Sequence, residues 1–209
     1  MAVELEGGCR VVGMKEGAPR RDGDLLIWDH CDAALSLRVL ELHGSAMLRS
    51  DTHDETLYII EEDVGIYVPA GETFGLHGDM TIVSSRAKKS GDRRPGSEDV
   101  HKVRLDDVPV QQTGDRWYRE LIQGETTQFV GSIPPGRAPD HFHLYEEVIC
   151  ILKGNGVMWG GDKSTPIAPG SCIFLPRKQR HCVENTGDGE LRLLGVFYPA
   201  GSPSVRYPA

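Results

Sequence analysis

Two histidines one residue apart open the stretch DHFHLYEEVICILKG, which covers residues 140–154. Side chains two residues apart on a β-strand point to the same face, so His141, His143 and Glu147 are expected on one side of an extended segment. Two neutral imidazoles and a carboxylate that converge on one point are a donor set for a divalent first-row metal ion. The spacing therefore predicts a metal site at the edge of the apolar run that follows.

Further ligands and reacting groups must come from neighbouring segments. His181 follows the apolar stretch CIFL and a polar turn, and it is the candidate for a fourth metal ligand from another strand. Tyr145, Arg137 and Arg180 are candidates for acid, base or substrate-binding roles, because they lie close in the sequence to the expected ligands. The alternative is that Tyr145 packs in the wall of the fold and that both arginines are solvated.

The elements that position these residues are expected to be short β-strands. Glycine occurs 25 times and proline 13 times, and between them lie short runs rich in Val, Ile, Leu, Phe and Tyr, a rhythm typical of an antiparallel sandwich or barrel. With 39% hydrophobic residues the chain can bury a core. Strands are predicted over 25–28, 37–42, 56–60, 65–68, 80–84, 128–133, 147–152, 156–159, 171–175 and 191–198.

The chain divides into two halves that look like diverged copies. Residues 86–99 are crowded with charge, Gly, Ser and Pro, which predicts a linker between a first domain over 1–100 and a second over 101–209. HDETLYII at 53–60 echoes HLYEEVICIL at 143–152, and each is followed by an apolar run that ends in proline. If Glu55 corresponds to Glu147, the first copy lacks about 15 residues, roughly one hairpin.

Charge and composition exclude several classes of partner. The formal net charge is −8, and no segment gathers enough Lys and Arg to follow a phosphate backbone, so nucleic acid is not expected. No apolar run approaches the roughly 20 residues of a membrane span. The first ten residues lack the blocks of a secretory signal, and the five cysteines form no CxxC pair, which favours a cytoplasmic protein with reduced thiols.

Residues 136–154 resemble the first motif of the cupins, in which glycine, an HxH pair, an acid and a second glycine follow one another. Here these are Gly136, His141, His143, Glu147 and Gly154, with four instead of five residues between Gly136 and His141.

The second cupin motif has its counterpart in GSCIFLPRKQRHCVEN. Gly170, Pro176, His181 and Asn185 fall in register, whereas Lys178 replaces the glycine of the motif. The resemblance implies an all-β fold of two cupin-type antiparallel barrels of the jelly-roll kind. It also implies one divalent metal ion (Mn, Fe, Ni or Zn) in the second barrel, held by the four candidate ligands His141, His143, Glu147 and His181.

The first half fits this pattern poorly. It offers His53 and Glu55 without an HxH pair, and Phe74 holds the place of the second-motif histidine. The resemblance therefore implies a truncated, degenerate first barrel without a metal, which supports packing or a homodimer. More loosely, the order of segments resembles the two-domain cupins of the 5-deoxyglucuronate isomerase kind.

A divalent ion on three histidines and one carboxylate keeps a net charge of about +1, which favours a small anionic or hydroxy-carbonyl substrate. The leading functional hypothesis is a metal-dependent enzyme that acts on a sugar, keto acid or hydroxy acid as an isomerase, through carbonyl polarisation and proton transfer. An iron-dependent dioxygenase and a non-catalytic small-molecule binding protein are the alternatives.

Overall fold

Strands make up most of the computed structural model, which describes residues 1–88 and 99–208. The helices in these ranges are two 3-10 turns, η1 (Glu6–Gly8) and η2 (Leu105–Asp107), and none is long and apolar enough to cross a membrane. Each of the ten predicted strands overlaps an observed strand. The strands pair antiparallel, which confirms the all-β prediction.

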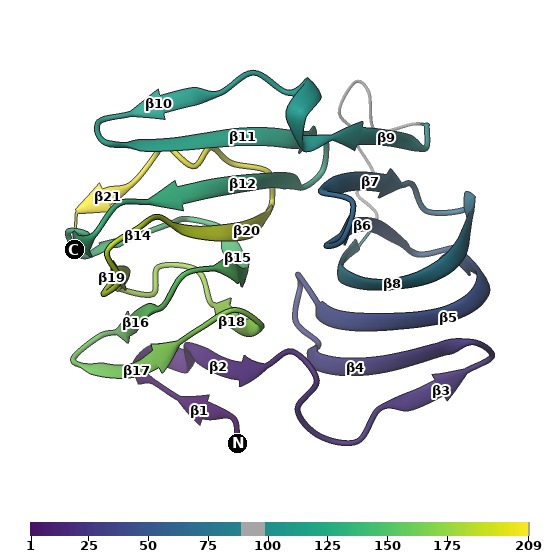
Figure 1. The fold of residues 1–209 in the computed structure, drawn as a ribbon, viewed down its shortest axis with the longest axis horizontal. Helices are drawn as coiled ribbons and strands as arrows, with labels where there is room; N and C mark the ends of the chain where they lie inside the picture. Colours follow the sequence, from purple (N-terminus) through teal and green to yellow (C-terminus); the bar gives the residue numbers. More distant parts are fainter. Residues whose placement is uncertain (89–98, 209) are drawn as a thin grey trace.

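The first barrel is formed by a seven-stranded sheet (Figure 1). In spatial order its strands are β3 (Arg20–Asp22), β4 (Leu25–Cys31), β5 (Leu37–Arg49), β8 (Thr73–Lys88), β6 (His53–Ile59), β7 (Val64–Val68) and β9 (His101–Arg104). Strands β5 and β8 pair from Arg38–Ser84 to Arg49–Thr73, so they run the whole length of the barrel.

The second barrel encloses its core between two sheets. The larger sheet has the order β1 (Val3–Glu4), β2 (Arg10–Gly13), β18 (Ser171–Leu175), β15 (Glu146–Lys153), β20 (Leu191–Tyr198), β12 (Thr127–Ile133), β11 (Arg116–Gln123) and β10 (Gln111–Thr113). The smaller sheet has the order β17 (Lys163–Ile167), β16 (Gly156–Gly160), β19 (His181–Asn185), β14 (His141–Phe142) and β21 (Tyr207–Pro208), and β13 (Gly136–Arg137) also pairs with β19.

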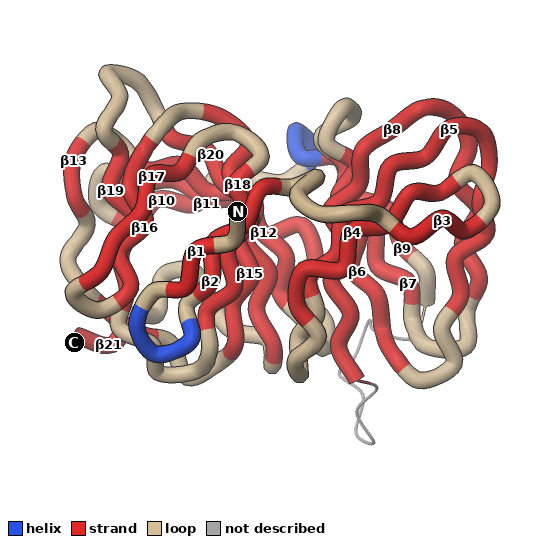
Figure 2. Tube along the Cα trace, turned by 90° about the horizontal axis from the view of Figure 1, so that it is seen from below, coloured by secondary structure: helices blue, strands red, loops and turns tan. Residues whose placement is uncertain are grey.

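The two barrels exchange strands at their ends, across the boundary predicted at residue 100. Strand β2, near the start of the chain, pairs with β18 of the second barrel, whereas β9 pairs with β7 of the first. Figure 2 shows β1 and β2 on the second barrel, ahead of the crossing into the first. Without these partners β7 and β18 would each expose an unpaired strand edge, so the exchange protects both barrels. Of the predicted linker, residues 86–88 belong to β8, and 89–98 lie outside the described residues.

Three apolar cores follow from strand alternation. In β15, Ile149 and Ile151 point into the second barrel, while Val148 and Cys150 join a core shared with the first barrel. In β6, Leu57 and Ile59 point into the first barrel, and Tyr58 joins the shared core. Both faces of these strands are buried, which explains why they read as continuous apolar runs.

The missing hairpin of the first copy is visible in the topology. In the second barrel, β15 and β18 pair with each other, and the hairpin β16–β17 lies between them in the sequence. In the first barrel, β6 and β7 pair in the same way but are joined by the short turn 60–63. The sequence prediction of one deleted hairpin is therefore confirmed.

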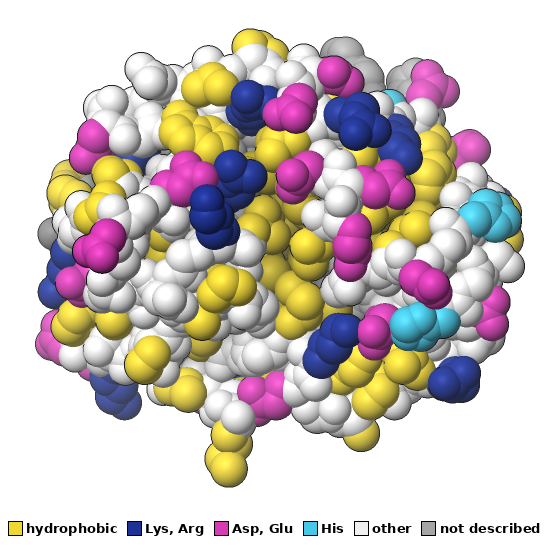
Figure 3. Space-filling view, viewed as in Figure 1, with side chains coloured by type: hydrophobic (Ala, Val, Ile, Leu, Met, Phe, Trp, Pro, Cys, Tyr) yellow, Lys and Arg dark blue, Asp and Glu magenta, His cyan; other side chains and the backbone are white. Residues whose placement is uncertain are grey.

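On the face drawn in Figure 3, acidic and basic side chains are interspersed, without a large patch of one sign.

Candidate metal centre

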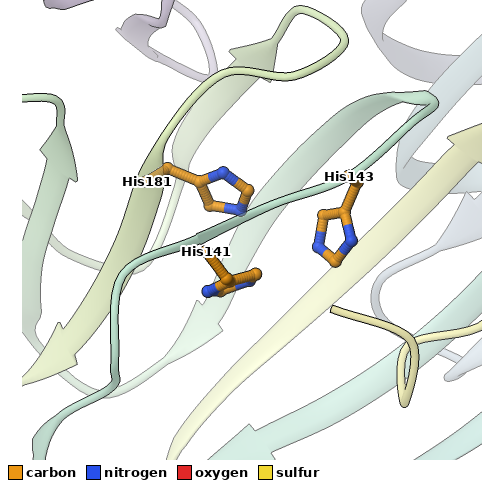
Figure 4. A group of neighbouring side chains, drawn as sticks. All are labelled: His141, His143 and His181. Atoms are coloured by element: carbon orange, nitrogen blue, oxygen red, sulfur yellow. The ribbon is translucent and has the colours of Figure 1, made fainter. Parts of the chain in front are cut away.

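Three histidines from two strands and the loop between β14 and β15 meet inside the second barrel. His141 on β14 is the direct partner of His181 on β19, and His143 follows β14 by one residue. Their ring centroids lie 4.4 Å apart for His141 and His181, 5.0 Å for His141 and His143, and 5.3 Å for His143 and His181. Figure 4 shows the rings gathered around a common space. One ring nitrogen of each lies within 4.8 Å of the others, which is compatible with binding a single metal ion.

Glu147 completes the group from β15. Its Oε2 atom lies 3.7 Å from His143 Nε2 and 3.6 Å from His181 Nε2. The residue is 5% exposed, and Oε2 has no hydrogen-bond partner among the described residues. Burying a carboxylate oxygen without a partner is costly, so this oxygen suits a cation placed between it and the imidazoles. The neighbouring Glu146 faces the other way and accepts a hydrogen bond from Leu35 N of the first barrel at 2.7 Å.

Backbone carbonyls set the orientation of each imidazole. The Nδ1 atoms of His141, His143 and His181 lie 3.1, 3.1 and 2.8 Å from the carbonyl oxygens of Pro139, Val205 and Gln179. A carbonyl can only accept a hydrogen bond, so Nδ1 carries the proton in each neutral ring. Each Nε2 then keeps a free lone pair, which is the arrangement that metal-binding histidines use.

Burial keeps the imidazoles neutral. Desolvation, followed by the nearby His181, lowers the pKa of His141 and that of His143 to about 3, and desolvation lowers the pKa of His181 to about 4. Desolvation also raises the pKa of Glu147 to about 8. At neutral pH the histidines are therefore ready as ligands, and a bound cation would favour the ionised form of Glu147.

A cavity of about 80 Å³ adjoins these four residues, which is space for a few waters or one small ligand. Part of its wall is apolar, with Phe129, Phe197 and Leu193, and two arginines, Arg116 and Arg206, also line it. The side chain of neither arginine makes a hydrogen bond or ion pair with another described residue. Burial and the nearby Arg206 lower the pKa of Arg116, as expected for two cations that share a cavity.

Tyr145 does not reach this cavity. The chain leaves the extended conformation between β14 and β15, so the two-residue alternation does not continue through Tyr145. The hydroxyl donates to Ser202 O at 2.9 Å, and the ring stacks on His143 with centroids 4.9 Å apart and planes 12° apart. Tyr145 thus packs behind His143 in the structure, and its catalytic role stays a prediction.

Arg137 and Arg180 also lie away from the cavity. Arg137 stacks over Trp159, with its guanidinium carbon 4.0 Å from the ring centroid, and pairs with Asp140 at 3.1 Å. Arg180 pairs with Asp162, and its Nη1 lies 3.7 Å from Asp140. Both belong to an ion-pair network and do not line the cavity, and their role as acid, base or substrate-binding group stays a prediction.

The arginines that do line the cavity were not found from the sequence. Arg116 begins β11, and Arg206 belongs to the segment that folds back so that β21 pairs with β14. They lie 25 residues before and 25 residues after the nearest predicted ligands, His141 and His181. No local motif marks them, because only strand pairing brings them to the cavity.

Comparison with known proteins places these residues in a wider group. Residues 129–197, which include all four candidate ligands, match the family described as Cupin domain. Protein SchB of Streptomyces halstedii is 33% identical over 100 residues, which are 44% of this chain and 72% of SchB. The oxalate-binding protein of Thermotoga maritima is 38% identical over 67 residues, which are 31% of this chain and only about half (55%) of that protein.

Solved structures extend the similarity to both barrels. Protein Ylba from E. coli has a TM-score of 0.78 at 12% identity, over 94% of this chain and 93% of that chain. A mutant of Bacillus subtilis oxalate decarboxylase has a TM-score of 0.67 at 13% identity, over 90% of this chain and 76% of that chain. At these identities the likeness concerns the two-barrel fold.

Proposed function

The chain belongs to the cupin superfamily, and from that premise we propose that its second barrel binds a small carboxylate anion beside one divalent metal ion. His141, His143, Glu147 and His181 would hold the ion. The unpartnered buried oxygen of Glu147 and the three free Nε2 lone pairs support this donor set. When bound, such an ion supplies a Lewis acid that can accept a carboxylate or carbonyl oxygen.

The observation that carries the proposed ligand class is the pair of unpartnered arginines in the same cavity. Arg116 and Arg206 present guanidinium groups, which match a carboxylate in charge and geometry. The cavity of about 80 Å³ restricts the ligand to a few heavy atoms. A two-carbon dicarboxylate such as oxalate, or a keto or hydroxy acid of similar size, fits these limits. The names of the oxalate-binding relative and of oxalate decarboxylase support the same class.

Binding is the function that the geometry supports best. An isomerase needs a group that takes up and returns a proton, and Tyr145, Arg137 and Arg180 do not line the cavity. Beyond the four proposed metal ligands, the described lining contains no carboxylate or imidazole, and Tyr118 supplies a phenol. Isomerase and dioxygenase activities are therefore secondary candidates, which assays on the purified protein would test.

Calorimetric titration tests the proposal. Protein loaded with Mn²⁺ should bind oxalate, and metal-stripped protein should bind it at least about tenfold more weakly, because the ion accepts one end of the ligand. Arg116→Met should weaken oxalate binding by at least about tenfold while Mn²⁺ binding persists. Arg21→Met, an exposed arginine on β3, is the matched control.

Equal oxalate affinity with and without metal would contradict the proposal, as would full affinity in Arg116→Met. Oxygen uptake by iron-loaded protein with a keto or hydroxy acid would favour the dioxygenase alternative.

A further inference from the structure

The first barrel has its own counterpart of the metal centre, and strand register identifies it. Glu147 pairs with Leu175, the residue before Pro176. Glu55 pairs with Val68, the residue before Pro69. The two glutamates therefore occupy equivalent places in the two barrels.

Two arginines of the first barrel replace two phenylalanines of the second. Across the next strand, Glu147 pairs with Phe197 and Glu55 pairs with Arg86. Gly195, two residues before Phe197, pairs with Phe129. Ser84, two residues before Arg86, pairs with Arg38. In the second barrel the two phenyl rings pack with centroids 4.9 Å apart. In the first barrel, guanidinium groups occupy these places.

The positions of His181 and His141 in the second barrel are held by apolar residues in the first. His181 lies five residues after Pro176 and pairs with His141. Phe74 lies five residues after Pro69 and pairs with Leu48. The first barrel has thus lost imidazole donors and gained cations around a retained acid, so its chemistry favours an anion over a metal ion.

Glu55 neutralises only part of this positive charge. Arg38 Nη2 donates to Glu55 Oε1, and Arg86 Nε donates to Glu55 Oε2 at 2.9 Å. Ser84 Oγ lies 2.8 Å from Arg38 Nη2 and donates to Glu55 Oε1 at 2.6 Å. Two cations and one carboxylate leave a net charge of +1. Arg38 is 5% exposed, and its Nε has no hydrogen-bond acceptor among the described residues.

Arg38 and Arg86 line a cavity of about 280 Å³ in this barrel. Leu25, Leu40 and Leu48, which belong to the apolar core of the barrel, form another part of the wall. The exposed wall of the cavity is mostly polar and the leucines supply its apolar part, so the cavity combines a buried, incompletely satisfied guanidinium with a smaller apolar surface.

The other charged groups of this wall restrict the ligand charge. Arg20 pairs with Asp29 at 3.0 Å, and Arg49 pairs with Asp51 at 2.7 Å. Asp24, which accepts a hydrogen bond from Ser45 N at 3.0 Å, and Asp22 also line the cavity. These two carboxylates would repel a dianion such as phosphate or oxalate. A second cavity of about 240 Å³ shares Arg20, Arg38 and Arg86 but is also lined by Asp29 and Asp32, so it is less suited to an anion.

We propose that the first-barrel cavity of about 280 Å³ binds a small monocarboxylate, with its carboxylate on Arg38 and Arg86 and its apolar body against the leucine wall. The site is independent of the metal centre. The first barrel would then bind an anion, whereas the donor set of the second barrel suits a metal cation.

Titration of metal-stripped protein with butanoate tests this site. Butanoate should bind saturably at one site per chain, whereas 1-butanol, which lacks the charge, and succinate, a dianion, should bind at least about tenfold more weakly. Arg86→Met should weaken butanoate binding at least about tenfold, because it removes one charged donor. Arg86 is chosen over Arg38 because its side chain is 28% exposed, so its loss is better tolerated. Arg21→Met, on β3 of the same barrel, does not line the cavity and should bind butanoate as the unchanged protein does.

A second measurement uses the unchanged chain. Methyl NMR with butanoate should shift the signals of Leu25, Leu40 and Leu48 more than those of Leu193 in the second barrel. Loss of butanoate binding in Arg116→Met but not in Arg86→Met would place the anion in the second barrel and overturn the proposal. Absence of saturable binding by the metal-stripped protein would overturn it as well.

Discussion

The imidazole of His143 donates its Nδ1 proton to the carbonyl of Val205, at 3.1 Å and 62 residues further along the chain. This bond ties the candidate metal centre to the segment that carries Arg206 and β21. The same carbonyl lies 3.3 Å from the hydroxyl of Tyr145, whose ring stacks on His143. The segment around Val205 therefore orients His143, a candidate metal ligand, and places Arg206 at the cavity.

Ending the chain at Ser202 should weaken metal binding. The truncation removes the acceptor of His143, and the loss of such outer contacts typically costs about 10- to 100-fold in metal affinity. Val205→Ala keeps the backbone carbonyl and serves as the control. Competition with a fluorescent chelator measures the affinity. Unchanged Mn²⁺ affinity in the truncated protein would show that the carbonyl does not support the ligand.

Replacing two of the three histidines should abolish the metal site. His141→Ala with His181→Ala removes the directly paired ligands on β14 and β19 and leaves at most two donors. Metal content measured after purification without chelators should fall from about one ion per chain to less than about a tenth of that. His43→Ala with His77→Ala, two exposed histidines of the first barrel, should retain full metal content. Full stoichiometry in the first pair would refute the assigned site.

The metal-stripped protein should be most stable near pH 6.5. The histidines have folded-state pKa values of about 3 to 4, below the ordinary 6.5, so the unfolded chain binds more protons and stability falls as the pH drops below 6.5. Glu147 has a folded-state pKa of about 8, above the ordinary 4.5, so the folded chain binds more protons and stability also falls as the pH rises towards 8. Between pH 6.5 and 8 only Glu147 of these four groups contributes, and the free energy of unfolding should fall by about 2 kcal/mol.

Glu147→Gln isolates this effect, because glutamine does not titrate. Urea unfolding of the metal-stripped variant should show the fall between pH 6.5 and 8 removed, and a steeper acid limb between pH 4.5 and 6.5, because Glu147 no longer opposes the histidines there. If the variant and the unchanged protein lose stability in parallel over that interval, Glu147 is not the group responsible.

Tyr145→Phe should change stability more than metal binding. The substitution removes the hydrogen bonds to Ser202 O and Val205 O and keeps the ring on His143. The free energy of unfolding should fall by about 1 kcal/mol, with metal content intact. Tyr207→Phe, whose side chain is exposed, provides the comparison. Loss of ligand binding in Tyr145→Phe with unchanged stability would instead support the catalytic role expected from the sequence.

The candidate metal donors could be located from the sequence because each motif is local. His141, His143 and Glu147 lie within seven residues, and the proline that ends β18 sets the distance to His181. Lys178, which departs from the motif, still adopts the left-handed conformation of the glycine it replaces, with φ of 62°. Local backbone geometry thus preserves the turn before His181 despite the substitution.

The sequence by itself determined the strand pattern, the repeat with its missing hairpin, and the candidate donor set, since all three depend on alternation and short spacing. Only the tertiary structure decided which charged residues share a cavity. Arg116 and Arg206 meet at the metal centre, and Arg38 and Arg86 meet around Glu55, through strands far apart in the chain. The exchange of β2 and β9 between the barrels was also decided only by the tertiary structure. Antiparallel pairing and the protection of exposed strand edges bring such residues together, and neither leaves a local sequence signal.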